Sequence, residues 1–239
     1  MSFKWKKYSI LFVPILSLIL ASCATTSGTK GSMSATPAIE RVEEAIEVIT
    51  EMADIPEEGV PEAIMRKARA VAIIPRVIKA AYGIGGQYGK GILALRNEKG
   101  EWSNPAFITL KGGSIGWQIG VRSSDIVLVF KSSRSIEKIT RGKFTLGVDA
   151  GVTAGPVGRS VEASTDMELK AEIYSYSRSR GLFAGVSIKG ASLEIDHDAN
   201  AAFYSSRDIR TSDILMNKEI EAPAIAETLK NILTKYVVR

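Results

Sequence analysis

The spacing of apolar residues predicts helices near both ends of the main body of the chain. After Thr36-Pro37, apolar residues recur every three or four positions as far as Ala53, and glutamates fill the positions between them, which is typical of an amphipathic helix with an acidic outer face. The same period predicts a short helix from Pro61 to about Ala70 and a longer one from Pro223 to Val238. The residues expected to face the core are Ile39, Val42, Ile46, Ile49 and Ala53 in the first helix, Ile64, Ala68 and Val71 in the second, and Ile225, Leu229, Ile232, Leu233 and Tyr236 in the last.

Between these helices the apolar period changes to two, which predicts a mainly antiparallel sheet. Short helical segments are expected over 135–141 and 199–205. We find no internal repeat and no second linker, so the expected fold is a single α+β domain with a twisted, mainly antiparallel β-sheet core, N-terminal amphipathic helices and a C-terminal helix. The expected strands are 71–77, 91–96, 102–110, 115–121 and 126–130, one alternating strand over 144–152, and a hairpin of 168–177 with 182–188.

The first residues have the pattern of a bacterial export signal. Three lysines at positions 4, 6 and 7 precede the apolar run 10–20, which is too short for the roughly 20 residues of a spanning helix. Leu20-Ala21-Ser22-Cys23 then resembles a lipobox, in which the cysteine is acylated after cleavage. We therefore expect residues 1–22 to be a signal peptide and Cys23 to be the lipidation site. The alternative is a soluble secreted protein with a cysteine there by chance.

The segment after Cys23 predicts a tether. Residues 24–36 are small and polar, and rich in Gly, Ser and Thr, so we expect a flexible link to a domain over 37–239. Ala24 stands where an Asp would retain a lipoprotein at the inner membrane. We therefore expect an exported protein, lipid-anchored at the periplasmic face of the outer membrane of a two-membrane bacterium.

Composition and charge exclude several classes of function. The 239 residues include one Cys and one His, which are too few for a Cys/His zinc site or a His-based catalytic triad. Loss of residues 1–22 removes three lysines and no acid, and lowers the formal charge from +5 to +2, which disfavours nucleic acid as a partner. We expect no metal, no cofactor and no enzymatic activity.

Two motifs invite a functional interpretation but fit a structural one better. The glycine-rich stretch 83–91 resembles a phosphate-binding loop, yet such a loop needs Gly where Ile84 stands and Ser or Thr where Gly91 stands. We expect a twisted, bulged strand pair there instead. His197, between Asp196 and Asp198, could suggest a metal ligand or a general base, but the sequence is more typical of a turn and a helix cap.

Basic residues are the candidate binding groups. Arginine presents a forked set of donors that suits phosphate oxygens, and basic residues near a bilayer bind anionic headgroups. The alternative is an ordinary solvated surface. The candidate lipid-binding residues are Arg66, Lys67, Arg69, Arg76, Lys79, Lys90, Arg178 and Arg180.

Six segments in order resemble the SYLF family of lipid-binding domains. The resemblance covers about residues 55–204. It is carried by Ala72-Ile-Ile-Pro75, Gly85-Gly-Gln-Tyr-Gly-Lys-Gly91, Trp102-Ser-Asn-Pro-Ala-Phe-Ile108, Gly116-Trp-Gln-Ile-Gly120, Gly155-Pro-Val-Gly-Arg159 and Tyr176-Ser-Arg-Ser-Arg-Gly-Leu-Phe-Ala-Gly185.

The resemblance implies a β-rich domain that binds phosphoinositides and other anionic lipids through basic residues and an amphipathic N-terminal segment. Some eukaryotic members also bind actin, a role we do not expect for an exported lipoprotein. The helix over 38–53 is acidic, so we expect Arg66, Lys67 and Arg69 on the short helix to dock the domain onto membrane phospholipids. The alternative is a scaffolding role in which the domain binds another envelope protein.

Overall fold

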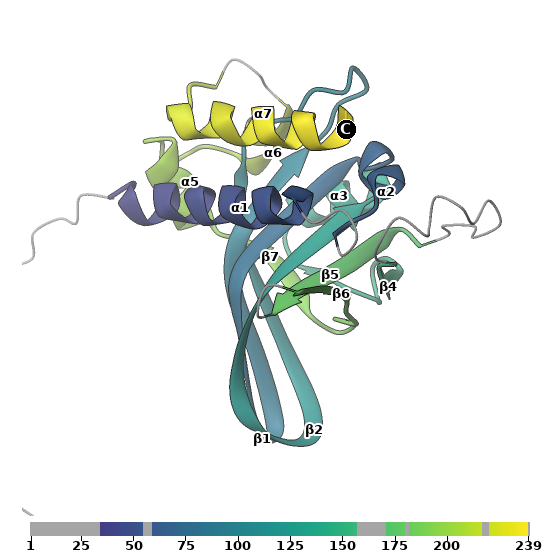
Figure 1. Ribbon diagram of the computed structural model, residues 1–239. Coiled ribbons are helices and arrows are strands. Elements are labelled where there is room, and N and C mark those ends of the chain that lie inside the picture. The colour runs from purple at the N-terminus through teal and green to yellow at the C-terminus, as the bar shows by residue number, and fades with distance from the viewer. Residues whose placement is uncertain (1–33, 55–58, 157–170, 180–181, 217–219, 239) are drawn as a thin grey trace, which may run out of the picture. The chain divides into compact units, whose positions relative to one another are not determined.

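A computed structural model describes residues 34–54, 59–156, 171–179, 182–216 and 220–238 (Figure 1). The predicted signal peptide, Cys23 and Arg180 lie outside the described residues. All described elements and one continuous apolar core belong to the compact unit Met33–Arg239. Because this unit contains its whole core, we expect it to fold on its own.

The centre of the fold is a two-stranded ribbon that is bent back on itself. Strand β1 (Ala70–Leu95) pairs antiparallel with β2 (Ala106–Phe130) along nearly its whole length. Near its middle each strand turns and runs back, as Figure 1 shows at the lower end of the ribbon. At the bend Gly83 alone lies opposite residues 116–118, because the outer strand of a curved pair has the longer path. The five strands expected over this region are therefore two.

Glycines let the two halves of β1 pass close to each other. A Cβ atom added to Gly91 would lie 2.3 Å from the carbonyl oxygen of Ile73, and one added to Gly89 would lie 2.7 Å from a methyl carbon of Val77. Side chains at these positions would hold the two layers apart. The expected twisted, bulged strand pair is confirmed, with register shifts between Ile74 and Val77 and again at the bend.

The remaining strands extend the ribbon into one seven-stranded sheet. Strand β5 (Ile173–Ser179) pairs with the returning half of β2, and β7 (Ser192–Ile195) pairs with its outgoing half. The predicted hairpin is confirmed as β5 with β6 (Leu182–Gly185). The edges are formed by β3 (Phe144–Thr145), which pairs with β7, and β4 (Val152–Ala154), which lies parallel to β5.

The single strand expected over 144–152 is wrong. Gly147 has a φ of 83°, and the chain turns there instead of continuing. The carboxylate of Asp149 accepts a hydrogen bond of 2.7 Å from the backbone N–H of Thr145, which closes the turn. A short polar side chain that bonds a nearby backbone group overrides the alternating pattern here.

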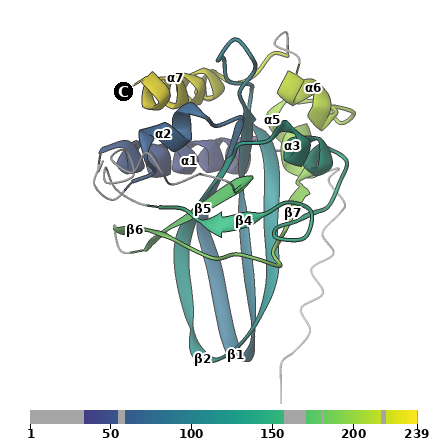
Figure 2. The ribbon, with the colours of Figure 1, turned by 90° about the vertical axis from the view of Figure 1, so that its right-hand side faces the viewer.

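The predicted helices at both ends of the domain are confirmed, and they lie together at the end of the ribbon away from the bend (Figures 1 and 2). Helix α1 (Thr36–Asp54) packs on β1, and α7 (Ala224–Val238) packs on α1. No described helix is long and apolar enough to cross a membrane. The other helices are α2 (Glu62–Arg66), α3 (Ser133–Thr140), α5 (His197–Phe203) and α6 (Thr211–Met216).

Two details of the helices differ from the expectation. The apolar face of α1 is wider than predicted, because the helix is covered by both β1 and α7, and Ile39, Ile46 and Ala53 lie at its edge. Helix α2 ends at Arg66, so Lys67 and Arg69 lie on the connection to β1. The residues of α1 that are buried are Ala38, Val42, Ala45, Val48, Ile49 and Met52.

Candidate functional site

The structure separates the described lipid-binding candidates into three places. Arg66, Lys67 and Arg69 lie between α2 and the start of β1, at the end of the ribbon that carries the helices. Arg76 and Arg178 lie beside the acidic face of α1, while Lys79 and Lys90 lie on the two halves of β1 toward the bend. The described candidates therefore do not form one patch.

The cluster near α2 is exposed and cationic. Arg66 forms a loose ion pair with Glu62 at 3.8 Å, one helical turn earlier. Its backbone oxygen accepts a hydrogen bond of 3.1 Å from the guanidinium of Arg96. Burial lowers the pKa of Lys131, and the nearby charge of Lys67 lowers it further. Several positive charges thus lie close together at this end of the ribbon.

Arg76 and Arg178 serve the packing of α1 in this structure. Arg76 pairs with Glu44, and Arg178 pairs with both Glu51 and Asp125, the last at 2.7 Å. Burial raises the pKa of Asp125, although its hydrogen bond from the backbone N–H of Arg76 opposes the rise. Two glutamates of the acidic face of α1, Glu44 and Glu51, are therefore paired with cations of the sheet.

Lys90 joins a second polar network. Its ammonium lies 3.3 Å from the carboxylate of Asp196, which also pairs with Arg41 of α1 at 3.1 Å. The other oxygen of Asp196 accepts a hydrogen bond of 3.1 Å from the backbone N–H of Ala199. The helix cap expected around His197 is confirmed.

Lys79 and Arg122 are paired cations on the ribbon, of which Arg122 is exposed and Lys79 is half-buried. They lie directly opposite each other in the β1 and β2 register, where like charges repel. Among the residues that the structure describes, no carboxylate pairs with either side chain. Partial burial lowers the pKa of Lys79 below its ordinary value. Beside them, on the other face of the strands, Ile78 is 51% exposed and Val121 is 74% exposed.

The second layer of the ribbon repeats this combination of apolar and cationic side chains. Tyr88 is 48% exposed and lies opposite Lys111 in the register. The ammonium of Lys111 donates a hydrogen bond of 2.6 Å to Glu194, which raises the pKa of the lysine and lowers that of the glutamate. A shallow hollow of about 480 Å³ lies beside Tyr88 and Lys111 and is also lined by Lys143.

We use the name tip for residues 80–89 of β1 and 112–121 of β2, which include the bend. These two segments contain no charged residue. Each is bracketed by two cations, Lys79 and Lys90 on β1 and Lys111 and Arg122 on β2, which we call the cation ring. The close approach of Gly89 to Val77 brings the two halves of β1 to a common level, so these cations surround the base of the tip.

The sequence analysis identified only two of the four residues of the cation ring. It selected Lys79 and Lys90 but not Lys111 or Arg122, and it did not single out the exposed Ile78 and Val121. The available signal was two uncharged segments of equal length, each rich in glycine and each flanked by cations. That signal has a meaning only when the two segments are known to be paired.

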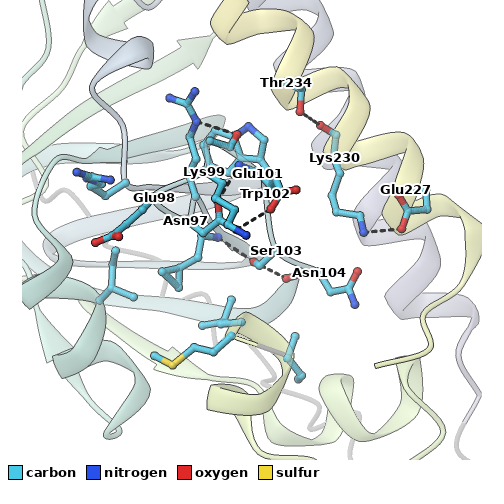
Figure 3. Close-up of a pocket in the computed structure, with 18 residues that line it drawn as sticks. Asn97, Glu98, Lys99, Glu101, Trp102, Ser103, Asn104, Glu227, Lys230 and Thr234 are labelled. Carbon is cyan, nitrogen blue, oxygen red and sulfur yellow. Dashed lines mark hydrogen bonds and ion pairs between the residues drawn. The ribbon is translucent and has the colours of Figure 1, made fainter. Parts of the chain in front are cut away.

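A larger cavity lies at the opposite end of the ribbon, beside the turn that links β1 and β2 (Figure 3). Its volume is about 940 Å³, and its wall combines Arg69, Lys99 and Glu98 with apolar residues of α6. Lys230 of α7 reaches Glu227 at 2.5 Å on the far wall. Trp102 and Asn104 line it as well, and each has a buried polar atom without a hydrogen-bond partner among the described residues.

The fold and the tip define an α+β domain built on a bent β-ribbon that presents cations around an uncharged end. A family model described as "Ysc84: Las17-binding protein actin regulator" matches residues 111–236. The chain belongs to this family, and the resemblance to SYLF domains is confirmed.

Curated relatives match most of the domain. SH3 domain-containing YSC84-like protein 1 of Rattus norvegicus is 36% identical over 182 residues, which are 76% of this chain and 53% of the relative. The protein of the same name from Homo sapiens is 37% identical over 182 residues, 76% of this chain and 52% of the relative. Protein YSC84 of Saccharomyces cerevisiae is 34% identical over 177 residues, 73% of this chain and 37% of the relative. The chain thus spans about half the length of the animal relatives, and less of the yeast one.

Proposed function

We propose that this chain is a lipid-anchored envelope protein whose folded domain binds anionic phospholipid surfaces and catalyses no reaction. The observation that carries the proposal is the pair of Lys79 and Arg122, which face each other without a carboxylate among the described residues. Phosphate or carboxylate groups of lipid headgroups would supply the missing negative charge. Cys23 would supply the covalent anchor through its acyl chains.

Repulsion between Lys79 and Arg122 favours the binding of an anion beside them. Two like charges opposite each other on a strand pair destabilise it, and an anion between them removes that cost. Each basic residue near an anionic membrane surface contributes about 1 kcal/mol, so two unpaired cations contribute about 2 kcal/mol, or roughly 30-fold in affinity. The contribution of this pair is expected to weaken at high salt, since exposed charges are screened.

The position of the cations supports the tip as the membrane-facing end. Sequence reasoning favoured Arg66, Lys67 and Arg69, but these residues lie at the helix-bearing end of the ribbon, so one flat bilayer does not contact both ends (Figure 2). The tip end adds exposed Ile78 and Val121 to its cations. Apolar side chains beside unpaired cations suit the boundary between headgroups and acyl chains.

The test compares two variants of equal charge change in residues 24–239. Sedimentation with vesicles of phosphatidylcholine alone, or mixed with phosphatidylserine, measures binding at low and high salt. We expect the wild type to bind only the anionic vesicles, Lys79→Glu with Arg122→Glu to reduce binding at least tenfold, and Arg66→Glu with Lys67→Glu to change it little.

Two other results of the sedimentation experiment would contradict the proposal. Loss of binding only in the Arg66 and Lys67 variant would place the membrane contact near α2, as the sequence favoured. No binding of the wild type to either vesicle would overturn the lipid function of the domain.

A protein partner is the second candidate function, favoured by the large cavity beside Trp102 (Figure 3). The matching family model is described as a Las17-binding actin regulator, so protein contacts belong to the family description. For this chain we propose a scaffolding contact with another envelope protein as the alternative. This alternative predicts a stable complex that forms without lipid. Lys99 lies on the cavity wall, so Lys99→Glu should abolish the complex.

A further inference from the structure

The tip has the composition of a segment that enters the bilayer and does not merely touch its surface. Residues 80–89 and 112–121 hold no charge, and in sequence they include Tyr82, Ile84, Ile115, Trp117 and Ile119. The strand register places these five residues at or next to the bend. An uncharged end with aromatic residues, bounded by cations, is the pattern of membrane-interface anchors.

Large apolar side chains are exposed near the tip on both layers of the ribbon. Ile78 and Val121 are exposed on one layer and Tyr88 on the other. These are three of the five large apolar residues that are exposed in the described part of the chain, the others being Val148 and Met216. A protein partner would cover one face of the ribbon, whereas a bilayer surrounds an inserted tip on all sides.

We propose that the tip inserts into one leaflet of an anionic membrane, with the cation ring at the level of the headgroups. This inference rests on the proposed lipid function and adds the depth and orientation of the contact. The bend lies about four residues beyond Lys79, or about 13 Å at the rise of a strand. That distance is less than half of the roughly 30 Å hydrocarbon core, so the tip enters one leaflet only.

The backbone of the bend sets a limit to the depth. Residues 116–118 have no partner in the strand register, so their backbone polar groups lie outside the ladder. Such groups need water or headgroup atoms, since unpaired backbone in hydrocarbon costs several kcal/mol. This cost limits the bend to the outer part of the leaflet, close to the boundary between headgroups and acyl chains, where tyrosine and tryptophan also favour lying.

A fluorophore at Val121 tests the depth directly. Residues 24–239 contain no cysteine, so Val121→Cys gives one thiol for an environment-sensitive label. The matched control is Val148→Cys, which is equally exposed but lies on the turn between β3 and β4, outside the ribbon. With anionic vesicles that carry brominated acyl chains, we expect the label at 121 to be quenched at least twofold and the label at 148 to be unchanged.

A second readout does not depend on labelling. Trp102→Phe leaves Trp117 as the single tryptophan of residues 24–239, and Trp117→Phe leaves only the buried Trp102. We expect the brominated vesicles to quench the first variant and not the second. Val121→Asp should reduce vesicle binding about tenfold, because it removes a valine that the bilayer would bury and places a charge there. Val148→Asp should not reduce vesicle binding.

The outcomes separate this inference from the function on which it rests. Sedimentation with anionic vesicles but no quenching of either probe would overturn insertion and leave surface binding in place. Equal quenching at positions 121 and 148 would overturn the tip as the inserted element. No sedimentation at all would overturn the lipid function and insertion together.

Discussion

A single carboxylate, that of Asp196, contacts three separate elements of the fold. Asp196 caps α5 through Ala199 and pairs with Arg41 on α1 and Lys90 on β1. Burial acts to raise the pKa of Asp196, but the hydrogen bond from Ala199 and the two cations outweigh it and hold the pKa below its ordinary value. One carboxylate thus connects a helix cap, the first helix and the ribbon.

Asp196→Asn should reduce stability in a pH-dependent way. Asparagine retains an oxygen for the cap but loses the charge, so we expect a loss of about 2 kcal/mol at pH 7. Because the folded-state pKa is depressed, this stabilisation is present above the unfolded pKa of about 3.9 and disappears as the pH falls through the folded value. Urea unfolding at pH 7 and near pH 3 measures it.

The neighbouring Asp198 provides the control for this prediction. It is exposed and lies in the first turn of the same helix, so Asp198→Asn should change stability by less than about 0.5 kcal/mol at either pH. A loss for Asp196→Asn that is the same at both pH values would contradict the assignment of the effect to ionisation.

At the scale of elements, periodicity predicted the helices well and the strands poorly. Helices α1, α3, α5 and α7 were expected close to where they lie, because each depends on local caps and on its own apolar face. Strands β1 and β2 were expected as five pieces, because Gly, Asn and Ser usually mark turns. Within this ribbon the glycines permit a bend while the hydrogen-bond ladder continues on either side of it.

Gly91→Ala tests the closure of the bent ribbon. The added Cβ would lie 2.3 Å from the backbone oxygen of Ile73 and 2.8 Å from the Cα of Ile74, so the two halves of β1 must separate. We expect a loss of about 3 kcal/mol in chemical unfolding. Gly113→Ala is the matched control, since its Cβ would meet no atom within 4 Å. An equally small effect of both substitutions would contradict the close packing of the layers.

At the scale of the whole domain, the two ends of the ribbon carry different features. The helices lie at one end and the tip at the other (Figure 1). The large cavity is lined by the turn between β1 and β2 and by residues of α6 and α7. In the proposed function, the tip faces the bilayer and the cavity faces away from it, free to contact a partner. The tether over 24–36 would allow the domain to reach the membrane that holds its acyl chains.

Cys23→Ser in the full chain tests the anchor. In a bacterial host with lipoprotein processing, we expect the wild type to carry acyl chains and to stay in the membrane fraction at high salt. The variant should lack the acyl mass and should leave the membrane fraction as salt rises, because only the salt-sensitive contact of the domain remains. Mass spectrometry and fractionation measure both properties, and unchanged mass on substitution would contradict lipidation.

The candidate site was only partly predictable from sequence, and particular residues show why. Arg66, Lys67 and Arg69 are neighbours in sequence and remain neighbours in the fold, so reasoning from spacing found them. Lys79 and Arg122 are far apart along the chain and meet only through the register of β1 and β2. Arg178 was expected at a binding surface, but the fold buries most of it against Asp125 and Glu51.

The sequence by itself determined the α+β class, the terminal helices and the family, because these depend on local periodicity and on ordered motifs. Only the tertiary structure decided that the uncharged segments 80–89 and 112–121 form one tip with a ring of cations at its base. The physical reason is that strand pairing joins residues at long sequence separation, and a bend at glycine sets which of them share a surface.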